Sequence, residues 1–131
     1  MKTHVFRLHR GEDLLLAIKT YCSAHQIEAG VVLSGVGCVT QARLRDASGV
    51  TLRSLSEHLE IVSLTGTVSR LRCHLHIALS REDLSTLGGH LVEGCLINTT
   101  GEIALLELED IAFSKAFDPE TGYDELVISP R

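Results

Sequence analysis

Two neighbouring stretches decide the fold of this chain: LEIVSLTGTV at residues 59–68 and RCHLHIAL at residues 72–79. Both are rich in aliphatic and β-branched residues, a composition typical of strands. Since only a few residues separate them, we expect the two strands to pair as a hairpin. Alternate side chains of a strand share one face, so His74 and His76 should project together while Cys73 points to the opposite face.

Strand signals recur along most of the chain. Alternating or β-branched runs predict further strands at residues 3–9, 31–33, 36–44, 86–93, 102–109 and 111–117, with a turn at 46–49. Residues 125–128 fit either a final edge strand or an arm that docks on a neighbouring subunit.

One segment has helical periodicity instead. After the acidic pair Glu12-Asp13, apolar side chains recur at the spacing of a helix face, and Gly30 lies just past the end; these apolar residues are Leu14, Leu15, Ile18, Tyr21 and Cys22. We therefore predict one main helix over residues 12–27. The whole chain, residues 1–131, is predicted to be a single α+β domain with a mostly antiparallel sheet of about seven strands.

Composition narrows the classes of function. The net charge is −5, and the densest basic groups are only Arg43-Leu44-Arg45 and Arg70-Leu71-Arg72. Binding to nucleic acid relies on clustered cations, so we expect it to be weak or absent. Neither a secretory signal nor an apolar run of the ~18 residues needed to span a bilayer is evident, and the four cysteines are widely spaced. We expect a cytoplasmic protein with reduced thiols and no membrane contact.

Three histidines are the candidate functional residues. His74 and His76 should share a strand face, and Gly88-Gly89 before His90 indicates a close backbone approach that can aim a third imidazole at them. Three imidazoles with an open fourth position are typical of a catalytic zinc site. The alternative is that these histidines line a hydrated face or a subunit interface without metal.

No catalytic residue can be assigned from the sequence. A zinc-activated water needs one nearby carboxylate, and nothing in the pattern selects among the candidates Glu57, Glu60, Glu93, Glu102 and Glu107. The glycines of Ser34-Gly35-Val36-Gly37 lack the third glycine and the following helix of a dinucleotide-binding loop, so a nucleotide cofactor is not expected.

Several of these segments, in this order and spacing, resemble one family, the PPC domain (plant and prokaryote conserved domain). The resemblance covers nearly the whole chain; it is carried by Arg10–Asp13, Ser34–Gly37, Leu59–Thr67, the pair His74 and His76, Gly88–Leu91, and Phe117–Tyr123. It implies a compact α+β domain that assembles as a homotrimer. It also implies a metal site, with zinc the expected metal, at His74, His76 and His90.

The family's DNA-binding label fits this chain poorly. Plant members carry AT-hook segments whose arginines enter the minor groove, and many bacterial members are called DNA-binding or regulatory proteins by that analogy. This chain resembles the stand-alone prokaryotic type, with no Arg-Gly-Arg-Pro element and no basic arm. A looser similarity to acetolactate decarboxylase, which holds zinc with a comparable histidine trio, raises the alternative of a zinc-dependent lyase or hydrolase acting on a small molecule at a trimer pocket.

Overall fold

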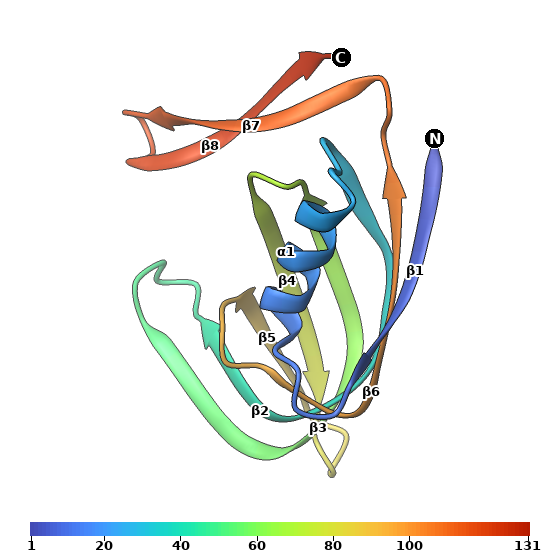
Figure 1. Ribbon diagram of the computed structural model, residues 1–131. Coiled ribbons are helices and arrows are strands. Elements are labelled where there is room, and N and C mark those ends of the chain that lie inside the picture. The colour runs from blue at the N-terminus through green and yellow to red at the C-terminus, as the bar shows by residue number, and fades with distance from the viewer.

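The computed structural model describes residues 1–131 and confirms the α+β class (Figure 1). It contains one helix and eight strands rather than about seven. In chain order these are β1 (Lys2–His9), α1 (Leu14–Ala24), β2 (Gly30–Arg45), β3 (Leu52–Val68), β4 (Cys73–Ser80), β5 (Thr86–Leu91), β6 (Leu96–Glu107), β7 (Ile111–Asp118) and β8 (Tyr123–Pro130).

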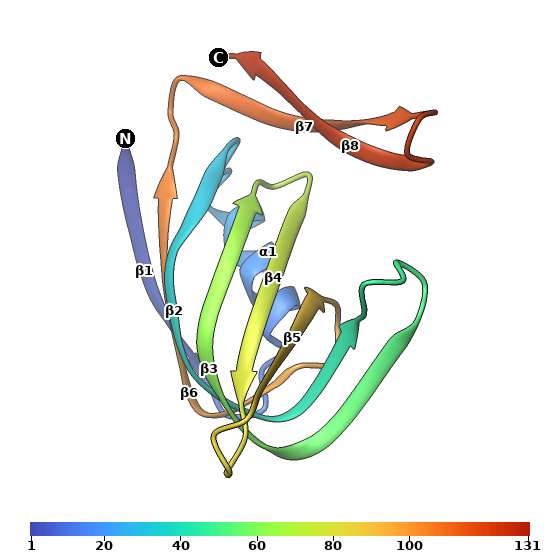
Figure 2. The ribbon, with the colours of Figure 1, turned by 180° about the vertical axis from the view of Figure 1, so that it is seen from behind.

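Six strands form one curved antiparallel sheet in the order β1-β6-β2-β3-β4-β5. The predicted hairpin is confirmed as β3 and β4, and its register places Thr65 opposite His76. At the far edge β5 pairs with β4 and also with β2, so the sheet curls back on itself. Helix α1 lies on the concave side of this sheet, as the two opposite views show (Figures 1 and 2).

The space between α1 and the sheet holds the apolar core. It is built almost wholly from aliphatic side chains, among which the fully buried ones include Leu14, Ile18, Leu59, Leu75, Leu79, Ile97 and Leu105. Asp13 fixes the start of the helix, because its carboxylate accepts hydrogen bonds from the backbone N–H groups of Leu16 and Gly94 at 3.1 and 2.7 Å. The helix is thereby attached at its first turn to the segment that precedes β6.

Several boundaries differ from the predictions. The runs expected at 31–33 and 36–44 form one strand, β2, and β3 begins at Leu52 rather than at residue 59. The helix is shorter than the predicted 12–27 and ends at Ala24, and Gln26 just beyond it takes a left-handed φ of 51°. Gly30 does not cap the helix but is the first residue of β2. Strand β6 begins at Leu96 rather than at residue 102. Its first half contains Asn98-Thr99-Thr100-Gly101, which is turn-like in composition, and Thr99 has a φ of 63° where the pairing with β2 shifts register. The polar segment thus forms an irregular part of a strand.

Strands β7 and β8 form a separate two-stranded sheet. In Figure 1 this hairpin (orange to red) crosses above the end of the main sheet near the N-terminal end of β4. The edge strand expected at 125–128 is therefore found, within β8. With 11 residues, the one helix is too short to cross a membrane.

Candidate metal centre

The pairing of β4 with β5 brings the three predicted histidines together. His76 lies directly opposite His90 in the register, and His74 projects from the same face of β4 two residues earlier. The ring centroids are 5.1 to 5.6 Å apart. One ligand nitrogen from each of His74, His76 and His90 lies within 4.8 Å of the other two. The structure therefore contains the three-histidine cluster that the sequence predicted.

The two glycines before His90 allow this close approach. A Cβ atom at Gly88 would lie 2.4 Å from the carbonyl oxygen of Ile77 on β4, and one at Gly89 would lie 2.8 Å from that of Arg45 on β2. Both distances are far shorter than an ordinary carbon–oxygen contact, so only glycine fits at either position. The prediction of a close backbone approach is confirmed. The two glycines let β5 lie tightly between β4 and β2.

Burial and nearby cations keep two of the imidazoles neutral. Burial, followed by the Arg45 guanidinium, lowers the pKa of His90 to about 4. Burial, followed by the Arg72 guanidinium, also lowers the pKa of His74. A neutral imidazole has the free lone pair that a metal needs, so these ligands stay available at neutral and mildly acidic pH.

Arg72 competes for one of these lone pairs. Its guanidinium donates a hydrogen bond to Nδ1 of His74 at 3.3 Å. Because a guanidinium has no acceptor, Nδ1 must accept, and the neutral ring then carries its proton on Nε2. A metal that binds either nitrogen of His74 therefore requires this hydrogen bond to break.

The cluster opens on a cavity of about 270 Å³. Besides His74 and His90, the lining residues are Arg45, Arg72, Cys73, Tyr123, Asp124 and Glu125. Asp124 and Glu125 come from the start of β8, so the C-terminal hairpin contributes the only carboxylates of this cavity. Cys73 stands at its edge but is not part of the ligand cluster, and its thiol donates to the carbonyl of Ser69 at 3.6 Å.

None of the five glutamates considered from the sequence lines this cavity. Glu57 pairs with Arg81, and Glu107 accepts a hydrogen bond from the buried His4 at 2.8 Å. The carboxylates that do face the histidines were missed because they lie on a different sheet. The one hint in the sequence was the turn-rich segment just before Tyr123, which carried part of the family resemblance.

The residues present fit a zinc-type ion. Nδ1 of His90 is buried and has no hydrogen-bond partner, which leaves a polar atom unsatisfied in the absence of a ligand. A tetrahedral ion with bonds of ~2.0–2.1 Å separates its ligand atoms by about 3.4 Å. The three ligand atoms already lie within 4.8 Å of one another, so the imidazoles need to draw together by less than about 1.5 Å to reach that value.

This fold and histidine cluster define a class of small α+β domains with a potential three-histidine metal site. The chain matches the Plants and Prokaryotes Conserved (PCC) domain over residues 1–109, and it belongs to that family. The resemblance drawn from the sequence is thus confirmed.

Three similar proteins extend the comparison. The "Bifunctional protein GlmU" of Synechococcus sp. (strain JA-2-3B'a(2-13)) is 42% identical over 99% of this chain, and the chain spans only 21% of its length. The structure of a hypothetical protein from Salmonella cholerae-suis is 33% identical, with a TM-score of 0.96 and coverage of 99% of this chain and 94% of that one. The metal-containing protein AF0104 from Archaeoglobus fulgidus is 30% identical, with a TM-score of 0.82 and coverage of 97% and 94%.

Proposed function

We propose that this chain binds zinc through His74, His76 and His90 and presents the metal to a small molecule. The observation that carries the proposal is the convergence of three ligand nitrogens within 4.8 Å on one sheet face. The similarity to a metal-containing protein of the same fold supports it. Since three protein ligands leave a tetrahedral ion one open position, a small molecule or water can bind there.

Metal analysis of protein purified without an affinity tag tests this proposal. We expect one zinc per chain in the wild type and less than a tenth of that in His76→Ala, which removes an exposed ligand without disturbing the core. His58→Ala is the matched control, because His58 lies on β3 outside the cluster and contacts Asn98 at 3.3 Å. Wild-type protein without bound metal, or equal zinc in the His76 variant, would contradict the proposal.

A second candidate is a zinc-dependent lyase or hydrolase, and the position of Glu125 favours it. Glu125 lines the same cavity as His74 and His90, where its carboxylate can hold or move a proton beside a bound substrate. When bound, zinc supplies a Lewis acid that polarises an oxygen of the substrate or acidifies a water. Small oxo and hydroxy acids should turn over with wild-type protein and not with Glu125→Gln or His90→Ala; absence of turnover in a broad screen would argue against an enzyme.

The exposed hairpin supports assembly as a homotrimer, as the resemblance implied. Its strands expose Phe117, Tyr123 and Ile128 at 65%, 51% and 63% of their surfaces. A two-stranded hairpin is only marginally stable by itself in water, so we propose that a second copy covers it. Light scattering should give three times the chain mass of 14.3 kDa for the wild type, and a smaller species for Phe117→Ser/Ile128→Ser. A monomeric wild type would rule out the trimer.

For nucleic acid we propose weak or no binding. The formal charge is −5, and the guanidiniums of Arg45 and Arg72 lie beside the histidine cluster instead of forming an open basic face. A mobility-shift titration with duplex DNA should show no complex at moderate salt, because phosphate contacts would need clustered free cations. A salt-dependent complex of micromolar affinity would contradict this expectation. The four free cysteine thiols fit our proposal of a reducing, cytoplasmic location.

A further inference from the structure

Two arginines that form no ion pair, Arg45 and Arg72, lie beside the histidine cluster. Nε of Arg45 is buried without a hydrogen-bond partner, and the only side-chain acceptor of Arg72 is the ring of His74. Neither arginine forms an ion pair, although seven ion pairs occur elsewhere in the chain. Asp124 and Glu125 line the same cavity but pair with neither guanidinium. A divalent cation bound there still meets two unpaired guanidiniums, so an anion that binds with it favours its binding.

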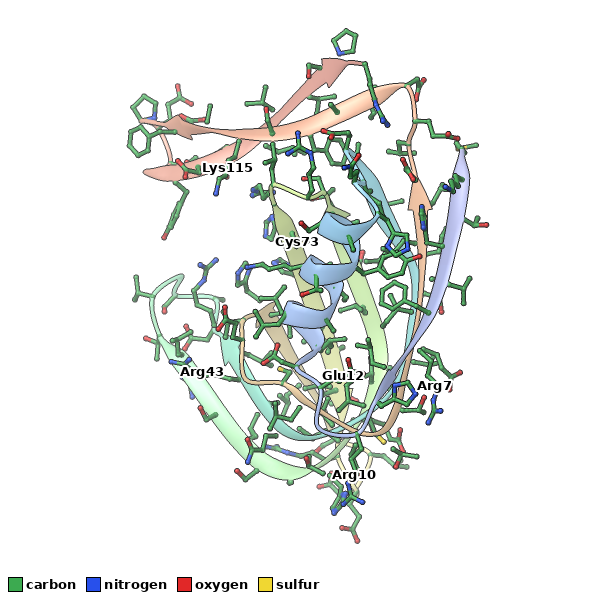
Figure 3. All side chains as sticks on the ribbon, in the orientation of Figure 1. Arg7, Arg10, Glu12, Arg43, Cys73 and Lys115 are labelled. Carbon is green, nitrogen blue, oxygen red and sulfur yellow. The ribbon has the colours of Figure 1, made fainter.

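A second, larger cavity of about 540 Å³ adjoins the first, and its lining carries more basic than acidic side chains. The two cavities share Arg72, Cys73 and Asp124. Lys19 from α1 and Lys115 from β7 line the larger one, and neither forms an ion pair. In Figure 3 Lys115 lies on the hairpin above Cys73, where β4 begins. The hairpin and the helix thus bring free ammonium groups to the edge of the histidine site.

The chemistry of the two cavities differs. In the smaller one a guanidinium fork beside a metal suits a carboxylate, which it can bind with two parallel hydrogen bonds. In the larger one the ammonium groups of Lys19 and Lys115, together with the hydroxyls of Thr20 and Ser23, suit the more highly charged phosphate. Asp124, which lines both, repels an anion but can accept a hydrogen bond from a hydroxyl between the two anionic groups.

We propose that the two cavities form one binding site for a small hydroxy acid that carries a phosphate, with its carboxylate at the histidine-bound metal and its phosphate between Lys19 and Lys115. This inference rests on the proposed metal function and names the ligand class of that site. Arg72 links the two halves: metal at His74 breaks its bond to Nδ1, and the freed guanidinium then binds the anion. Metal and ligand should therefore strengthen each other's binding.

Calorimetry on zinc-loaded protein at constant ionic strength tests the inference with three probes. 3-Phosphoglycerate carries both anionic groups, glycerate lacks the phosphate, and glycerol 3-phosphate lacks the carboxylate. We expect 3-phosphoglycerate to bind at least tenfold more tightly than either of the other two. The double variant Lys19→Met/Lys115→Met should lose that tenfold advantage and bind glycerate as the wild type does, whereas Lys2→Met, an exposed lysine on β1, should change nothing.

The zinc content measured on the same samples separates the two proposals. If zinc is bound through the histidines but the three probes bind equally or not at all, the ligand inference is wrong and the metal proposal stands. If metal-free protein binds 3-phosphoglycerate as tightly as the zinc form, the ligand does not reach the metal and the inference is again wrong. If the wild type binds no zinc, the metal proposal fails and the ligand inference fails with it.

Discussion

Replacing Gly88 by alanine should damage both the stability of the sheet and the metal site. The new Cβ atom would lie 2.4 Å from the carbonyl oxygen of Ile77, and an ordinary contact needs about 3.4 Å, so β4 and β5 must separate by about 1 Å. Alanine by itself favours folding by about 0.4–1 kcal/mol at a position whose φ is not positive, because it restricts the unfolded chain. Steric overpacking of this kind costs about 1–3 kcal/mol and should exceed that gain.

Strand β5 cannot avoid the clash by shifting as a whole. On its other side, the backbone of Gly89 lies close to β2. A Cβ atom added at Gly89 would be only 2.8 Å from the carbonyl oxygen of Arg45. The separation therefore falls on the pair His76 and His90, and we expect zinc affinity to fall at least tenfold, or about 1.4 kcal/mol. Urea unfolding of the metal-free protein measures the first effect, and competition with a chromophoric chelator measures the second.

Gly11→Ala is the control for this experiment. Gly11 has a φ of 89° with open space around the added Cβ, so the variant should lose about 1 kcal/mol of stability through backbone strain alone. Its zinc affinity should equal that of the wild type. A Gly88→Ala protein with unchanged unfolding free energy and unchanged zinc affinity would refute the argument that strand proximity sets the site.

Three further changes test other parts of the structure. His4→Ala should lower the unfolding free energy by about 2–4 kcal/mol, because the buried carboxylate of Glu107 loses its imidazole partner and keeps only the longer contact of 3.7 Å to Arg131. The exposed His9→Ala should change the free energy by less than about 0.5 kcal/mol in urea unfolding. Asp13→Ala should cost about 1–2 kcal/mol in the same assay, since two backbone N–H groups lose their acceptor; an unchanged midpoint would contradict its capping role. In metal-free protein an NMR titration should find His90 with a pKa of about 4, below the ~6.5 of an unfolded chain. Between these two pH values the unfolded state binds more protons than the folded state, so the unfolding free energy should fall as the pH falls from about 6.5 to about 4. A normal titration of His90 would contradict its burial beside Arg45.

Local patterns predicted most of the fold and the three-histidine cluster. Period-two runs identified the β3–β4 hairpin, and alternation along β4 placed His74 and His76 on one face. The pairing of β5 with both β4 and β2 could not be predicted from local patterns, because it depends on how far the whole sheet curls. For that reason the sequence did not show that Arg45 would lie beside His90, or that Asp124 would reach the cavity from a second sheet.

The same long-range pairing explains the unusual charge of the site. His90 is held between His76 on one side and Arg45 on the other, so a cation is built into the register next to a proposed metal ligand. A closed structural metal site gains nothing from such a neighbour, since the guanidinium opposes the bound ion. A site that must bind an anion together with its metal does gain, because the same arginine then attracts the anion. The arginines beside the histidines therefore favour a ligand-binding centre over a structural one.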